Sequence, residues 1–109
     1  MKLGSQSRND IAQGVADILT RAHRPDARVI LFGSRARGDA HDDSDWDLLI
    51  LLDKDAITRD DMDTISYPIR ELGWELDEMI NPIMYTTSEW EKKHFTPFYK
   101  NVMKEGVAI

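Results

Sequence analysis

Apolar positions recur along this chain with two alternating periods, which predicts helices separated by short strands. From Ser7 to Ala22 the apolar residues stand three or four positions apart, and this spacing predicts an amphipathic helix that ends before Pro25. The apolar run Arg28–Phe32 is rich in strand-forming residues and predicts a strand buried on both faces. A second run, Asp45–Leu52, predicts another strand.

The second half of the chain continues this alternation. Helical spacing of apolar residues predicts a helix over Thr58–Leu72, with a kink or break at Pro68. A third strand is expected within Trp74–Thr86, and Pro82 is expected to end or bend it. A short helix follows, and the pattern assigns no element to residues 96–109. Strands separated by helices predict an α/β fold, a small mixed sheet of three or four strands flanked by helices.

The composition is that of a globular protein and predicts a single domain, residues 1–109. Hydrophobic residues make up 41% and charged residues 31% of the chain, which excludes a disordered or collagen-like protein. No cysteine is present, so disulfides and cysteine-based metal sites are excluded. The longest apolar run, Leu48–Leu52, is too short to span a membrane and no signal peptide is recognisable, so we expect a cytoplasmic protein. The net charge of −6 argues against tight binding to a nucleic-acid backbone.

Two aspartates at the start of the second predicted strand are the first candidate functional residues. Asp45 and Asp47 are two residues apart, so their side chains point to the same face of a strand, with Cα atoms about 6–7 Å apart. Trp46 and Leu48 then point the other way, into the core. Two carboxylates this close repel each other unless a cation lies between them, and Mg²⁺ is typically held by few carboxylates and a substrate phosphate. The pair predicts a site for Mg²⁺ or Mn²⁺.

A glycine and a serine follow the first predicted strand. Gly33 lets the backbone approach a ligand closely, and Ser34 offers a hydroxyl and N–H groups at the start of a short helix. Arg35 and Arg37 can supply positive charge to a polyphosphate. These four residues predict a phosphate-binding loop beside the metal site, where a nucleoside triphosphate with Mg²⁺ could be held and part of it transferred.

The segment Phe32–Leu52 resembles the signature of the DNA polymerase beta-like nucleotidyltransferase superfamily. The shared residues are Gly33-Ser34, then ten residues, then Asp45-x-Asp47. The fuller string is most similar to the minimal nucleotidyltransferases, which are about as long as this chain. The resemblance implies the nucleotidyltransferase fold, contacts of Gly33 and Ser34 with the triphosphate, and metal binding by Asp45 and Asp47.

In this family a third carboxylate on a later strand acts as a base or as a metal ligand. Asp77 is the best match in this sequence, and the resemblance assigns it that catalytic and metal-binding role. Glu78 is one residue further along the expected strand and points to its opposite face, so we expect it to have no part in the site.

The resemblance implies an enzyme that transfers AMP from Mg-ATP to a hydroxyl group. Stand-alone minimal members are often antitoxins paired with an α-helical HEPN toxin, and there they resemble protein adenylyltransferases that modify a tyrosine of the toxin. The resemblance therefore implies ATP and such a protein as partners. An acidic chain fits a protein partner better than a nucleic acid.

Two alternatives stay open. One is a module that binds a nucleotide or neutralises a partner with little or no catalysis, and the other is an enzyme acting on a small molecule, for which the chain has little spare length.

Overall fold

A four-stranded sheet with the strand order β3-β2-β1-β4 forms the centre of the molecule. The computed structural model describes residues 4–41 and 44–109. The strands are β1 (Arg28–Phe32), β2 (Trp46–Leu52), β3 (Ile80–Thr86) and β4 (Val107–Ala108). β1 is antiparallel to both β2 and β4, and β2 is parallel to β3. This mixed sheet confirms the predicted α/β fold.

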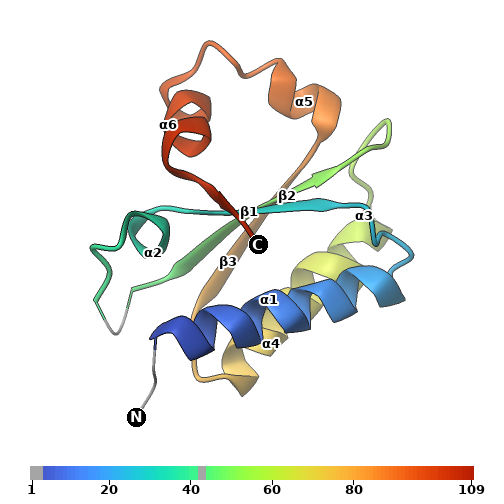
Figure 1. Ribbon diagram of the computed structural model, residues 1–109. Coiled ribbons are helices and arrows are strands. Elements are labelled where there is room, and N and C mark those ends of the chain that lie inside the picture. Colours follow the sequence, from blue (N-terminus) through green and yellow to red (C-terminus); the bar gives the residue numbers. More distant parts are fainter. Residues whose placement is uncertain (1–3, 42–43) are drawn as a thin grey trace.

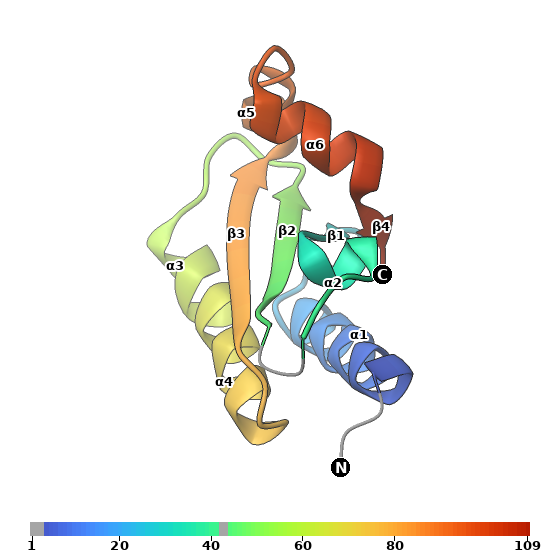
Figure 2. The ribbon, with the colours of Figure 1, turned by 90° about the vertical axis from the view of Figure 1, so that its left-hand side faces the viewer.

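Helices cover both faces of the sheet. They are α1 (Gly4–Arg21), α2 (Ser34–Arg37), α3 (Arg59–Asp61), the π-helix η1 (Met62–Ser66), α4 (Tyr67–Glu75), α5 (Thr87–Glu91) and α6 (Pro97–Glu105). α1 and the segment α3–η1–α4 lie against one face, and α5 and α6 lie against the other (Figure 1; Figure 2). No helix within the described ranges is both long and apolar enough to cross a membrane.

Each face of the sheet carries its own apolar core, because side chains alternate along the strands. Leu48 and Ile50 of β2 belong to the core beneath α1 and α4. Leu49 belongs to the core beneath α5 and α6, which also contains Trp90. Burial on both faces explains the unbroken apolar run of β2. It also fixes the register of the strand, since a shift by one residue would turn Asp47 from its own face into the core beneath α1.

Pro68 determines how the predicted helix over Thr58–Leu72 is built. Proline has no N–H to donate, so it is tolerated in the first turn of a helix but not further inside. In the structure it lies in the first turn of α4, and the turn before it is π-helical, with the Tyr67 N–H donating to the carbonyl of Met62. The predicted break is therefore a π-helical turn in a helix that continues to Glu75.

The expectation that Pro82 ends the third strand is wrong. Pro82 lies within β3 and is paired with Leu48 in the parallel register. β3 is an edge strand, so a residue without an N–H can be accommodated with its nitrogen directed away from β2.

Residues 96–109, to which the pattern assigns no element, form α6 and β4. The Thr96 side chain caps α6 by accepting a hydrogen bond from the Tyr99 N–H, and Pro97 occupies the first turn. At the other end, a Cβ on Gly106 would lie only 2.6 Å from a methyl carbon of Ile30. Glycine at this position therefore allows α6 to end directly against β1.

Candidate active site

Asp45 and Asp47 lie at the end of the sheet where β2 begins. Asp45 immediately precedes β2, and Asp47 is its second residue. Trp46 between them is 2% exposed and packs in the core beneath α1 and α4. The two carboxylates therefore project from the other face of the sheet, as the alternation predicts.

Asn81 of β3 reaches both carboxylates. The parallel register pairs Asn81 with Asp47. The Asn81 amide nitrogen donates to Oδ2 of Asp45 at 2.9 Å and to Oδ1 of Asp47 at 3.5 Å. A neutral amide thus joins the two acidic side chains. Sequence reasoning missed this residue, although it has a signal: like Asp47, it is the polar second residue of an otherwise apolar strand start.

The backbone of Gly33 lies directly against Asp47. Gly33 follows β1, whose last residue, Phe32, is the antiparallel partner of Asp47. Its φ of 77° is one that side-chain-bearing residues rarely adopt, and a Cβ at this position would lie 2.5 Å from Oδ2 of Asp47. Ser34 comes next and begins α2. The Gly-Ser pair and the aspartate pair are therefore neighbours in space, as predicted.

Burial raises the pKa of the Asp47 carboxyl above its ordinary value. The charge of Asp45 acts in the same direction, while the hydrogen bond from Asn81 opposes both. Burial and a like charge both disfavour the ionised form, and a bound cation would favour it. A counter-ion would therefore favour the ionised form of Asp47, the carboxyl that lies against Gly33.

This raised pKa leads to a prediction for the metal-free protein. A raised pKa in the folded state means that ionised Asp47 costs stability above that pKa, and that this cost disappears as the pH falls towards the ordinary aspartate value. Asp47→Asn should therefore raise the melting temperature at pH 7 in EDTA, and the gain should shrink on acidification. A variant less stable than wild type at pH 7 but not at pH 4 would contradict the sign of this effect.

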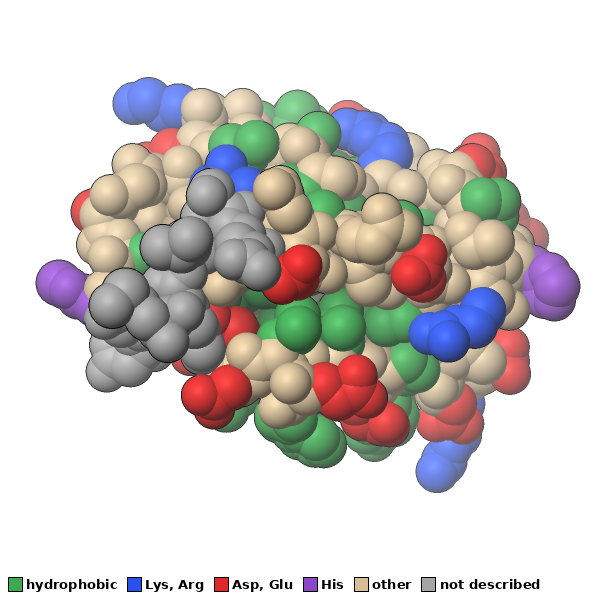
Figure 3. Space-filling view, turned by 60° about the horizontal axis from the view of Figure 1, so that its bottom comes forward, with side chains coloured by type: hydrophobic (Ala, Val, Ile, Leu, Met, Phe, Trp, Pro, Cys, Tyr) green, Lys and Arg blue, Asp and Glu red, His purple; other side chains and the backbone are tan. Residues whose placement is uncertain are grey.

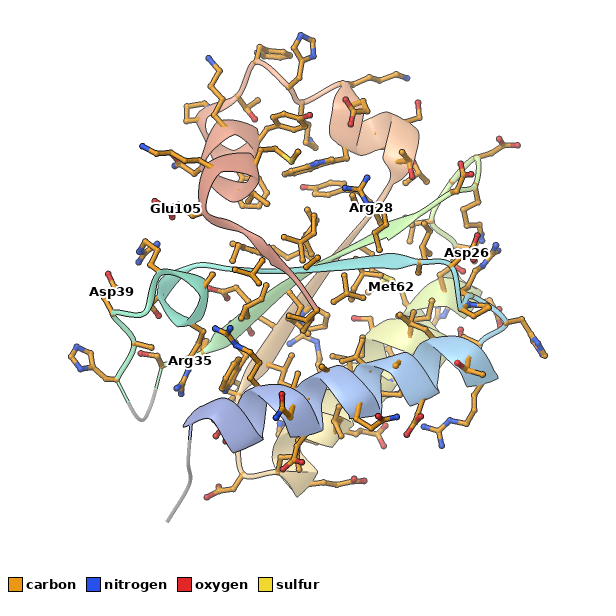
Figure 4. The ribbon with its side chains drawn as sticks, in the orientation of Figure 1. Asp26, Arg28, Arg35, Asp39, Met62 and Glu105 are labelled. Carbon is orange, nitrogen blue, oxygen red and sulfur yellow. The ribbon has the colours of Figure 1, made fainter. Side chains whose placement is uncertain are left out.

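Arg35 does not point towards the aspartate pair, contrary to the predicted phosphate-binding role. Its guanidinium donates to the Ser44 carbonyl at 2.9 Å and lies 4.4 Å from the centre of the Trp46 ring. Because Trp46 faces the core beneath α1, Arg35 lies on the opposite face of the sheet from Asp47, and Figure 4 shows it on the side of α1. Through these two contacts the arginine stabilises the segment that leads into β2.

Arg37 remains beside the candidate site. Its guanidinium is paired with Asp39 at 3.3 Å and with Glu105 of α6 at 3.4 Å. These two carboxylates, Asp39 first, raise the pKa of Arg37 above its ordinary value. Arg37 therefore links α2 to α6, and the predicted contact of this residue with a phosphate stays a prediction.

Asp77 is not part of a strand, so its predicted position is wrong. It lies in the turn between α4 and β3 with a φ of 56°, and β3 begins only at Ile80. The turn forms because the Glu78 N–H donates to the Gly73 carbonyl at 2.7 Å as α4 ends. The strand residue that the register pairs with Asp47 is Asn81, four positions after Asp77.

Glu78 faces away from the aspartate pair, as predicted, but it is buried and bonded. Its carboxylate accepts a hydrogen bond from Trp46 Nε1 at 2.9 Å and lies 3.7 Å from the Arg35 guanidinium. The Ser7 hydroxyl of α1 also donates to it at 3.4 Å. Glu78 and Arg35 together clamp α1, the start of β2 and the turn before β3 on the face behind the site.

The residues at the aspartate pair suit Mg²⁺ or Mn²⁺. Both ions prefer oxygen donors, and Mg²⁺ is commonly held by one or two carboxylates with waters and substrate phosphates. Rotation of the Asn81 amide would turn its oxygen, in place of its nitrogen, towards the point between Asp45 and Asp47. Among residues 4–41 and 44–109, no group of three His, Cys, Asp or Glu side chains could hold a metal. The two aspartates are therefore the acidic donors available in the described site.

Comparison with solved structures gives the class of the fold. The chain superimposes on the crystal structure of a toxin-antitoxin with AMP-PNP, with a TM-score of 0.56 and 20% identity, over 88% of this chain and 69% of that one. It also superimposes on a crystal structure described as "a putative nucleotidyltransferase" from Sulfolobus solfataricus, with a TM-score of 0.54 and 22% identity, over 99% of this chain and 87% of that one. At this identity the likeness shows the fold alone, which is the nucleotidyltransferase fold.

The sequence comparison gives the family. The nucleotidyltransferase domain family matches residues 12–109, and the chain belongs to that family. Two relatives come from Methanocaldococcus jannaschii, and each carries the name "Putative protein adenylyltransferase". One is 37% identical over 82 residues, which is 75% of this chain and 76% of the relative. The other is 38% identical over 82 residues, which is 75% and 77% of the two chains.

Proposed function

We propose that the protein transfers AMP from ATP to a hydroxyl group of a partner protein, at a metal-nucleotide site built on Asp45 and Asp47. One observation carries this proposal. Two aspartates stand together on one face of the sheet, with the Asn81 amide on one side and the bare backbone of Gly33 on the other. The names of the two archaeal relatives support AMP as the transferred group and a protein as its acceptor.

Each residue of the site has a part in this reaction. Asp45 and Asp47 would hold Mg²⁺ or Mn²⁺, and Asn81 would turn its amide oxygen to the same point. The ion, when bound, neutralises charge on the triphosphate. Gly33 leaves room for the Asp47 carboxylate against its backbone, and the Ser34 hydroxyl next to it would donate to a phosphate. The acceptor hydroxyl attacks the α-phosphorus in line, so that its new O–P bond forms as the bond to pyrophosphate breaks, and its proton leaves to solvent.

The surface of the protein favours a protein acceptor over a nucleic acid. The segment from Asp53 to Glu78 holds nine acidic and three basic residues, and seven of the acidic ones are exposed, all but Asp61 and Glu78. Within it, Tyr67 and Trp74 of α4 are 56% and 66% exposed. Figure 3, which views the molecule from the side of α1 and α4, shows acidic side chains around apolar ones. Such a surface repels phosphates and suits a partner with a basic surface.

A toxin is the partner class that best fits these observations. The structural neighbour with AMP-PNP is a toxin-antitoxin, which supports an antitoxin role for this chain. We propose a helical HEPN-type toxin as the acceptor, and the cytoplasm, where ATP is available, as the site of the reaction.

Asn81 favours a second candidate function. An amide cannot take the proton of an attacking hydroxyl, as a carboxylate can. With Asn81 paired to Asp47, the domain could hold a metal nucleotide and neutralise its partner by contact, with little or no transfer.

Labelled ATP distinguishes the two functions. The protein is incubated with Mg²⁺, a candidate partner and ATP labelled either at the α- or at the γ-phosphate. Adenylyl transfer moves the α-label to the partner and leaves the γ-label in pyrophosphate. Absence of α-label on a partner that is nevertheless bound and inhibited would contradict the transferase and favour the binding module. Transfer of the γ-label would contradict both.

A further inference from the structure

A cleft of about 320 Å³ opens beside the aspartate pair. The end of β1 and α2 form one side of it, and α6 forms the other, with Phe32, Gly33, Arg37, Phe98, Asn101 and Glu105 among its lining residues. Phe32 packs with the core beneath α5 and α6, which is the face from which Asp47 projects. Gly33 both lines the cleft and lies against Asp47, so the cleft and the metal-nucleotide site are continuous at this residue.

α6 presents an aromatic ring and an amide to this cleft. Phe98, Asn101 and Glu105 stand three and four positions apart, so they share one face of the helix. The Phe98 ring is held by edge-to-face contacts with Phe32 and Trp90, at centroid distances of 5.5 and 5.6 Å. Asn101 is exposed to solvent. An aromatic ring beside a side-chain amide is the combination that proteins use to bind and read a nucleobase.

An ion pair joins the two sides of the cleft at its rim. Arg37 of α2 lies 3.4 Å from Glu105 at the end of α6. Figure 4 shows Glu105 on the α6 side of the sheet, away from Arg35. Because Gly106 lets α6 close on Ile30 of β1, the helix that carries Phe98 and Asn101 is anchored at its end. The cleft is therefore built by packed elements on both sides.

We propose that this cleft receives the nucleoside part of the nucleotide, with a purine base against Phe98 and its edge read by Asn101. The inference rests on the proposed function, because it takes the triphosphate to lie over Gly33 beside Asp47. The cleft volume is at the lower end of the range for ligand sites, which suits one nucleoside. An amide offers one donor and one acceptor, which match the N6 and N7 atoms of adenine, whereas guanine offers two acceptors at that edge. Adenine is therefore the preferred base.

The test compares ATP with inorganic tripolyphosphate, which has the phosphates but no nucleoside. Binding of each is measured by calorimetry with Mg²⁺ for wild type, Asn101→Leu and Phe98→Leu. Asn101→Leu should weaken ATP binding by about tenfold, the scale of one lost base contact, and leave tripolyphosphate binding unchanged. Wild type should bind ATP more tightly than GTP, and Asn101→Leu should lose this preference. Phe98→Leu should weaken ATP binding in the same selective way.

Two controls separate this inference from the proposed function. Asn9→Leu makes the same exchange at an exposed residue of α1, on the other face of the sheet, and should bind ATP as wild type does. Asp45→Asn with Asp47→Asn should weaken ATP and tripolyphosphate alike. Unchanged ATP binding by both cleft variants would overturn the nucleoside site and leave the proposed function standing. Wild-type protein that binds neither ligand would overturn both.

Discussion

Asn81→Asp should raise the rate of AMP transfer by about 10²-fold, the scale of one acid–base group. The register pairs Asn81 with Asp47, and the amide already contacts both aspartates. A carboxylate at this position adds a negatively charged oxygen ligand and a group that can accept the proton of the attacking hydroxyl. The initial rate with α-labelled ATP and saturating Mg²⁺ measures the change. In EDTA the same variant should melt at a lower temperature than wild type, because three carboxylates then repel one another.

Asp77→Asn is the matched control for this prediction. Asp77 lies in a left-handed turn with a φ of 56°, a conformation that Asn also adopts readily. Transfer by this variant should stay close to wild type. Loss of transfer in Asp77→Asn together with no gain in Asn81→Asp would show that Asp77 is the third functional carboxylate, and would contradict the assignment based on the strand register.

Glu78→Ala should destabilise the fold by on the order of 3 kcal/mol, the scale for one partner removed from a buried ion pair. The Glu78 and Arg35 side chains are only 5% and 13% exposed. The variant therefore removes the buried carboxylate that lies 3.7 Å from the Arg35 guanidinium. It also removes the acceptor of the Trp46 indole N–H. Urea unfolding followed by circular dichroism measures the loss.

Glu75→Ala is the control for the buried glutamate. Glu75 is the last residue of α4 and is exposed, so its removal should change the free energy of unfolding by no more than about 0.5 kcal/mol. Equal losses in the two variants would contradict the clamp by Glu78 and Arg35. A stability loss in Glu78→Ala alone, with Mg-ATP still bound by the folded fraction, supports a structural role behind the site.

Local patterns in the sequence were sufficient to locate the aspartate pair and the glycine beside it. The apolar run of β2 requires burial on both faces, so alternation alone places Asp45 and Asp47 opposite Trp46. The β-formers of β1 end at Gly33, and the antiparallel pairing of β1 with β2 then brings this glycine to Asp47. These features depend on residues close together in the sequence and on one strand pairing.

The remaining features of the site depend on tertiary contacts. The start of β3 is set by the turn after α4, so a helix that continues to Glu75 moves Asp77 out of the strand and makes Asn81 the partner of Asp47. The direction of Arg35 is set by its contacts with the Trp46 ring and with Ser44, neither of which follows from local spacing. The cleft beside the site requires α6. Phe98 and Val102 of this helix have helical spacing, but its packing against the sheet does not follow from its own residues.

The most direct test of the central claim, that Asp45 and Asp47 hold a metal nucleotide, is the melting temperature with and without Mg-ATP. A ligand that binds only the folded state raises its stability, by about 2.7 kcal/mol at a hundred times the dissociation constant. Wild type should melt at a higher temperature with Mg²⁺ and ATP together, and much of this gain should vanish with ATP in EDTA. Asp45→Asn with Asp47→Asn should fold and show no metal-dependent gain. A full gain in that double variant would contradict the claim and place the site elsewhere.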